Sequence, residues 1–155
     1  RFSYRLFEPA TDWQVKFFAW ADSTDPRTKS EAFTRLLNGT PLTTARTSRL
    51  DYLWSRPTIP GLPSSKWALE ATTRVTVPVG THTLRTISDD AVRVWVDGTL
   101  VIDNWVPHES AVDAVPIAAG PHDVRVQYVQ VEGWTELRLE IVKGAQRASG
   151  SPGPH

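Results

Sequence analysis

Two aspartates, Asp89 and Asp90, stand side by side in the segment ISDDAVRVWVDGTLVIDNW, residues 87–105. Adjacent like charges repel, and strands disfavour Asp. A glycosidase holds two carboxylates about 5–9 Å apart across a cleft, whereas neighbours on an ordinary trans strand point to opposite faces. This pair therefore does not suit a two-carboxylate hydrolase. Two interpretations stay open: a solvated turn, or two ligands of one shared cation.

Calcium is the cation that suits such a pair. It takes oxygen ligands from carboxylates, amide carbonyls and water, at about 2.3–2.6 Å. Both carboxylates can face one ion only if the backbone leaves strand geometry, and a cis peptide bond between Asp89 and Asp90 would achieve this. Ser-Asp-Asp is also ordinary turn chemistry, so the pair alone does not decide between the two interpretations.

Other chemistry finds little support in the sequence. The chain has no cysteine, which excludes disulfides, zinc thiolates and cysteine nucleophiles. It contains no phosphate-cradling glycine loop, no GxSxG elbow and no HExxH motif. His82 and His122 fall on expected strands, and only His108, in the loop after Asp-Asn-Trp, is a candidate for function. We therefore expect a protein that is not an enzyme.

The composition fits one folded domain. The 155 residues carry 17 Lys and Arg against 17 Asp and Glu, so the formal net charge is zero. Because there is no basic excess, we expect no nucleic-acid partner. No apolar run approaches the ~18 residues of a membrane span, so this segment should not insert into a membrane. The chain does not begin with Met, and we expect it to be part of a longer protein.

Alternating apolar and polar residues predict an all-β fold, an antiparallel β-sandwich of about nine to eleven strands. Asp97-Gly98 lies between two apolar runs and predicts a tight hairpin. The proline-rich segment 55–66 predicts a surface loop. Residues 1–145 should form the single domain, and 146–155 a flexible linker or tail.

One short helix is expected near the N-terminus, in the segment DPRTKSEAFTRLLNG. Asp25 is a suitable N-cap, and Pro26 suits the first helical position. Phe33 and the leucines after it give the apolar stripe, and Asn38-Gly39 should end the helix.

Several spaced motifs now point to a family. They are Pro60-Gly61-Leu62-Pro63, Trp67, Val77-Pro78 with Gly80, Ser88-Asp89-Asp90, Trp95 with Asp97-Gly98, and Leu100 to Trp105. In this order they resemble the protective-antigen β-domain, a lectin-like module of toxins, yeast flocculins, glycosidases and glycosyltransferases. The resemblance covers about residues 50–142 and includes a closing hairpin over 118–139. Where the family usually has glycine after the second aspartate, this chain has Ala91.

The resemblance implies a β-sandwich that holds Ca²⁺ through Asp89 and Asp90, joined by a cis peptide bond. It also implies further ligands from the loop between the last two strands, where Gln130 or Glu132 would give a side-chain oxygen and Trp134 a carbonyl. Sugar hydroxyls would complete the coordination.

Four residues are candidates for sugar contacts on this interpretation. Trp105 and Trp134 would stack on the sugar, while His108 or Glu132 would set selectivity.

Two functions from different classes follow from these expectations. The first is a calcium-dependent carbohydrate-binding module of a larger extracytoplasmic protein, whether secreted, periplasmic or at the cell surface, with a glycan as its partner. The second is a structural or protein-interaction module without sugar binding, in a parent such as a glycosyltransferase or glycosidase, with other domains of that parent as partners.

Overall fold

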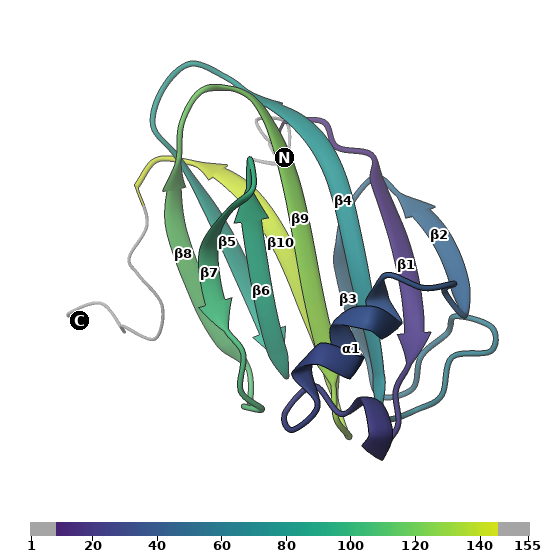
Figure 1. Cartoon of the computed structure of the whole chain (residues 1–155). Coiled ribbons are helices and arrows are strands. Elements are labelled where there is room, and N and C mark those ends of the chain that lie inside the picture. Colours follow the sequence, from purple (N-terminus) through teal and green to yellow (C-terminus); the bar gives the residue numbers. More distant parts are fainter. Residues whose placement is uncertain (1–8, 146–155) are drawn as a thin grey trace.

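The computed structural model describes residues 9–145, which form two antiparallel sheets packed face to face (Figure 1). The strands are β1 (Trp13–Ala19), β2 (Thr43–Thr47), β3 (Asp51–Trp54), β4 (Trp67–Val77), β5 (His82–Asp89), β6 (Ala91–Val96), β7 (Thr99–Asn104), β8 (Ala111–Ile117), β9 (Gly120–Gln130) and β10 (Thr135–Lys143). The six-stranded sheet has the order β2-β1-β4-β9-β6-β7, and the four-stranded sheet β3-β10-β5-β8. Over the described residues, the predicted all-β sandwich is confirmed.

The core lies between the two sheets and follows the predicted period of two. In β1, Trp13, Val15 and Phe17 are buried, while Gln14 and Lys16 are exposed. Aromatic and aliphatic side chains from both sheets fill the space, among them Trp13, Phe17, Trp67, Leu84, Val94, Val126, Tyr128 and Leu137. Burial of these apolar side chains is the main stabilising contribution to the fold.

The turn between β6 and β7 is formed by Asp97 and Gly98, as predicted. Both residues have positive φ, 51° and 82° respectively. Two-residue turns with positive φ at both positions match the twist of the flanking strands, and Asp-Gly is among the sequences that favour them.

The helix α1 (Ser30–Leu37) begins later than predicted. The Asp25 carboxylate accepts hydrogen bonds from the main chain and side chain of Arg27, and the Asp25 carbonyl accepts one from Lys29 N–H. Asp25 and Pro26 therefore belong to a turn that follows the 3₁₀ helix η2 (Asp22–Thr24), and the predicted cap was wrong. The C-terminal prediction is confirmed, because Asn38 caps the helix.

α1 packs on the outer face of the six-stranded sheet and crosses only its lower part in Figure 1. Its buried side chains, Phe33 and Leu37, pack in one cluster with Phe18, Trp20, Ala68, Ala91 and Val129. Ala91, at the position where glycine is usual, is thus part of a small second core. Residues 1–8 of the predicted domain and the predicted tail, 146–155, lie outside the described residues.

Within residues 9–145, no helix is long and apolar enough to cross a membrane.

Candidate calcium and carbohydrate site

The two aspartates lie at the lower end of the sandwich, where the chain passes from one sheet to the other. Asp89 is the last residue of β5 and pairs with Glu136 of β10, and β6 begins at Ala91. The peptide bond between Asp89 and Asp90 is cis, as the resemblance implied. Asp89 is half-buried, whereas only 8% of Asp90 is exposed.

Both aspartates have a pKa above the usual range. Burial is the main cause for each. The negative charge of Asp90 further raises the pKa of Asp89, and that of Glu132 further raises the pKa of Asp90. Hydrogen bonds from the main chain of Val131 and His108 partly offset the effect on the Asp90 pKa. Within residues 9–145, neither carboxylate forms an ion pair with a lysine, arginine or histidine.

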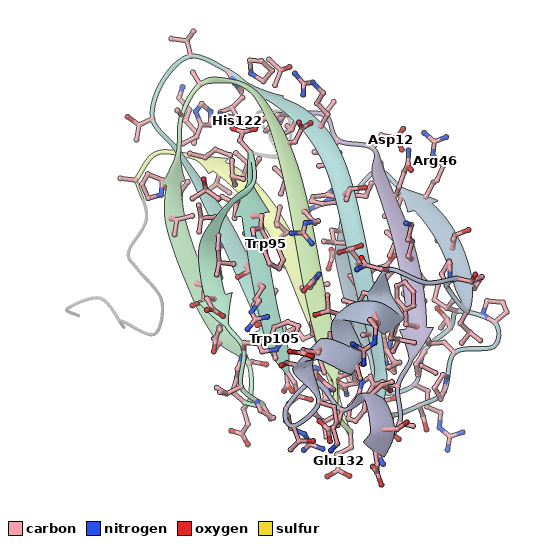
Figure 2. The ribbon with its side chains drawn as sticks, in the orientation of Figure 1. Asp12, Arg46, Trp95, Trp105, His122 and Glu132 are labelled. Atoms are coloured by element: carbon pink, nitrogen blue, oxygen red, sulfur yellow. The ribbon has the colours of Figure 1, made fainter. Side chains whose placement is uncertain are left out.

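The loop between β9 and β10 is attached to this pair by its main chain. Val131 N–H donates to Asp90 Oδ2 at 3.0 Å, and the Val131 carbonyl accepts from Lys66 N–H, also at 3.0 Å. Gly133 has a φ of 85°, a conformation that glycine adopts without steric cost, and it allows the loop to turn back into β10. Glu132, at the loop tip, is exposed and points away from the sandwich (Figure 2).

Gln130 is completely buried beneath this loop. Its amide nitrogen donates to the carbonyl oxygens of Gly133 and Trp134, at 2.9 and 3.0 Å. Its side-chain oxygen lies 2.9 Å from the hydroxyl of Tyr128, which also hydrogen-bonds the carbonyl oxygen of Asp89. Gln130 thus connects the acidic pair to the loop from inside, and its amide group already has protein partners on both sides.

Tyr128 is the residue at this site that sequence reasoning missed. Its ring is fully buried, and burial raises the pKa of its hydroxyl far above the usual range, so the group stays a neutral donor. A tyrosine on the apolar face of β9 looks like an ordinary core residue in the sequence. Only the pairing of Val92 with Tyr128, which joins β6 to β9, shows that the hydroxyl reaches the acidic turn.

His108 lies beside the two aspartates, as the sequence suggested for a functional histidine. Its main chain hydrogen-bonds Asp90, and its charge lowers the pKa of Asp89. Its Nδ1 is 2.5 Å from the Glu109 carbonyl oxygen, while its Nε2 is buried and has no hydrogen-bond partner among the described residues. A buried polar atom without a partner is costly to the folded state.

The two candidate tryptophans differ in how much of each ring is free. Trp105 is half-buried: it packs against Phe33 of α1, with ring centroids 6.1 Å apart, and the guanidinium of Arg93 lies 4.3 Å from its ring centroid. Trp134 is 46% exposed on the loop that carries Glu132. Trp134 is therefore better placed to meet a ligand.

Arg27 is a further neighbour that sequence reasoning missed. Its pKa is raised mainly by the hydrogen bond to Asp25, and to a smaller extent by the charge of Asp90. The guanidinium stays with Asp25, at 2.8 Å, and so does not neutralise the acidic pair. The position of Arg27 in the sequence, just before a predicted helix, does not indicate that it lies near Asp90.

The donor set fits a hard cation such as calcium. Residues 9–145 contain no group of three or more His, Asp or Glu side chains arranged to hold a metal ion. Asp89 and Asp90 would therefore be the charged ligands, and carbonyl, water or ligand oxygens would supply the rest, which is a mixture that calcium accepts.

Comparison with known proteins places the chain in a family. The PA14 domain family model matches residues 20–151, so this chain belongs to the PA14 domain family. The solved PA14 sugar-binding domain from an RTX adhesin has a TM-score of 0.63 at 18% identity, with 91% of this chain and 94% of that chain covered. The β-sandwich is thus shared at low sequence identity.

Anti-sigma factors are also similar to this chain. The anti-sigma-I factor RsgI3 of Acetivibrio thermocellus is 38% identical over 53 residues, which is 32% of this chain and 8% of that protein. A solved anti-sigma factor domain-containing protein has a TM-score of 0.68 at 19% identity, over 86% of this chain and 43% of that chain. The chain therefore spans less than half the length of both proteins.

Proposed function

We propose that this domain binds glycans through a calcium ion held by Asp89 and Asp90. The observation that supports this most is the buried carboxylate of Asp90 beside the half-buried one of Asp89, neither of which has an ion pair among residues 9–145. Such charge is costly without a counter-ion. Bound calcium would supply a Lewis acid that accepts sugar hydroxyl oxygens as further ligands.

The surrounding residues have separate parts in this proposal. Trp134 covers an apolar face of the sugar, while Glu132 or His108 sets the selectivity for its polar groups. Gln130 and Tyr128 hold the loop and the acidic turn in place. Affinity for a single glycan should be weak, with a Kd of roughly 1 mM, so that useful binding depends on several sites or on tethering.

A calcium titration tests the proposal. Saturating calcium should raise the melting temperature by roughly 5 °C, and a chelator should reverse the rise. The double variant Asp89→Asn with Asp90→Asn should lose the shift and keep the β circular-dichroism spectrum. The matched control is Asp12→Asn with Asp123→Asn, which removes two exposed carboxylates elsewhere and should keep the shift. A wild-type melting temperature that ignores both calcium and chelator would remove the basis of the mechanism.

Glycan binding is measured next, on a glycan array with calcium and with chelator. We expect signals that depend on calcium and disappear in the double variant. A calcium response without any glycan signal would leave a metal-stabilised domain that does not bind sugar.

A second function is favoured by the likeness to anti-sigma factors. In this alternative the domain is a structural or interaction module of a larger protein and binds no sugar. The packing of Trp105 supports it, since it reduces the aromatic surface that is free for a ligand. The occupied amide of Gln130 likewise reduces the free polar groups. In both functions we place the domain outside the cytoplasm, in a secreted or surface-exposed parent, and without catalytic activity.

A further inference from the structure

The outer face of the six-stranded sheet carries a second feature, away from the acidic pair. Its lower part is apolar and lies under α1, whereas no element crosses its upper part in Figure 1. The uncovered part contains a hollow of about 630 Å³. Its lining includes Gln14, Thr72, Arg74, Trp95, Asp123 and Arg125.

The hollow is built on one continuous row of residues across the sheet. Trp95 of β6 pairs with Arg125 of β9, Arg125 with Thr72 of β4, and Thr72 with Gln14 of β1. Residues paired in this way lie side by side on one face, so the row continues over four strands. With neighbouring strands about 4.8 Å apart, it spans about 14 Å, which is room for a short chain of sugars rather than one.

Trp95 gives the row a flat apolar surface. The Trp95 ring is half-buried, and the guanidinium of Arg125 lies over it, 3.9 Å from the ring centroid, so that one face of the ring is covered by a second planar group. Figure 2 shows Trp95 on the uncovered part of the sheet, well above Trp105 and α1. An aromatic ring beside planar groups rich in N–H donors matches a sugar, which has apolar C–H faces and a rim of hydroxyls.

The charged residues that line this hollow are paired, which indicates a neutral ligand. Arg74 pairs with Asp123 at 2.8 Å, and Arg125 with Glu70 at 3.1 Å. At the rim, Arg93 pairs with Asp103, and Arg46 with Asp12. Since each of these guanidinium groups already has a carboxylate, the hollow offers hydrogen bonds without the unpaired positive charge that a nucleic acid or an acidic polymer needs.

We propose that this hollow is a second carbohydrate site, which binds a neutral polysaccharide chain across β6, β9, β4 and β1 without calcium. The part of the Trp95 ring that Arg125 leaves free packs against one sugar ring, while Gln14, Thr72 and Arg125 hydrogen-bond the hydroxyls of the chain. The site shares no residue with the acidic pair and does not rest on the calcium-dependent function.

Gel electrophoresis through soluble neutral polysaccharides tests this proposal. The gels contain hydroxyethylcellulose, soluble starch or galactomannan. All of them contain EDTA, which removes calcium and so prevents any binding through a calcium site. We expect at least one of them to retard the wild-type protein. Trp95→Ala should weaken this retardation about tenfold, and Gln14→Ala severalfold. Because Gln14 is exposed, its variant stays folded even if loss of Trp95 disturbs the sheet.

The controls separate this site from the acidic pair. Asp89→Asn with Asp90→Asn, and Trp134→Ala, should be retarded as strongly as the wild type in EDTA. A gel with polygalacturonate should not retard the protein. The proposal is overturned if no neutral polysaccharide retards the wild type, if only polygalacturonate does, or if folded Trp95→Ala and Gln14→Ala both behave as the wild type.

Discussion

The main-chain N–H of Val131 donates a hydrogen bond to the carboxylate of Asp90, at 3.0 Å. This contact joins a loop between two late strands to the turn that carries the acidic pair, 41 residues earlier in the chain. A substitution in one of the two segments should therefore alter the stability of the other.

Asp90→Asn should stabilise the protein when no calcium is present. The buried carboxylate carries a charge that no cation in the described residues pairs, and the neutral amide keeps an oxygen for Val131 N–H. At pH 7 with EDTA, we expect the urea midpoint of the variant to exceed that of the wild type. With calcium the order should reverse. A lower midpoint in EDTA would show that the charge at Asp90 is well tolerated.

Gln130→Ala should destabilise the fold by about 1–3 kcal/mol, because it leaves two loop carbonyls without a partner and removes one of the two acceptors of the Tyr128 hydroxyl. Urea denaturation measures this change. The matched control is Gln127→Ala on the same strand, which loses only a half-exposed hydrogen bond to Glu70 and should cost less than about 0.5 kcal/mol. Equal costs for the two variants would contradict the bracing role of Gln130.

Trp105→Ala should lower the stability of the fold, whereas Trp134→Ala should weaken glycan binding. Trp105 packs against Phe33 and Arg93, so its loss should lower the melting temperature. Trp134 is exposed, so its loss should leave melting unchanged and weaken calcium-dependent glycan binding about tenfold. If the Trp134 variant binds glycans as the wild type does, the ligand lies elsewhere.

The pair formed by His122 and Asp97, at 2.6 Å, should make stability depend on pH. The hydrogen bond to Asp97 raises the pKa of His122, and the bond from His122 lowers the pKa of Asp97. The His122 contribution is complete below about pH 6.5 and is lost as the pH rises through its folded pKa. The Asp97 contribution is present above about pH 3.9 and is lost on acidification. Stabilisation by this pair should thus be greatest between these values.

The measurement is the urea midpoint between pH 4 and 9, compared for wild type and His122→Gln. We expect the difference between the two proteins to shrink as the pH rises from 6 to 9. A difference that stays constant over this range would show that the pair is not charged in the folded protein.

Central strands and tight turns could be predicted from the sequence because their signals are local. The alternation in β1 and β9 and the Asp97-Gly98 turn depend on neighbouring residues, and the structure confirms them. The edge strands β2, β3 and β8 escaped prediction, since edge positions are half-exposed and carry weak alternation. In β8, Pro116 adds a residue that is tolerated only at such edges.

The candidate site was predictable in part. Asp89, Asp90 and His108 do meet, because two of them are adjacent and the third lies in a loop at the same end of the sandwich. The part played by Tyr128 depends on the register of β9 against β6, which residue types do not fix. The packing of Trp105 likewise depends on α1, an element whose docking face no local pattern specifies. Ligand roles for Gln130, Glu132 and Trp134 stay predictions.

The loop between β9 and β10 is held through its backbone rather than through its side chains. Asp90 binds Val131 N–H, Lys66 N–H binds the Val131 carbonyl, and Gln130 binds two carbonyls further on. The side chains of Glu132 and Trp134 take part in none of these hydrogen bonds, so substituting them should leave the loop conformation unchanged. The loop is thus a natural place for ligand preference to diverge between relatives, and a safe place to install a new specificity by design.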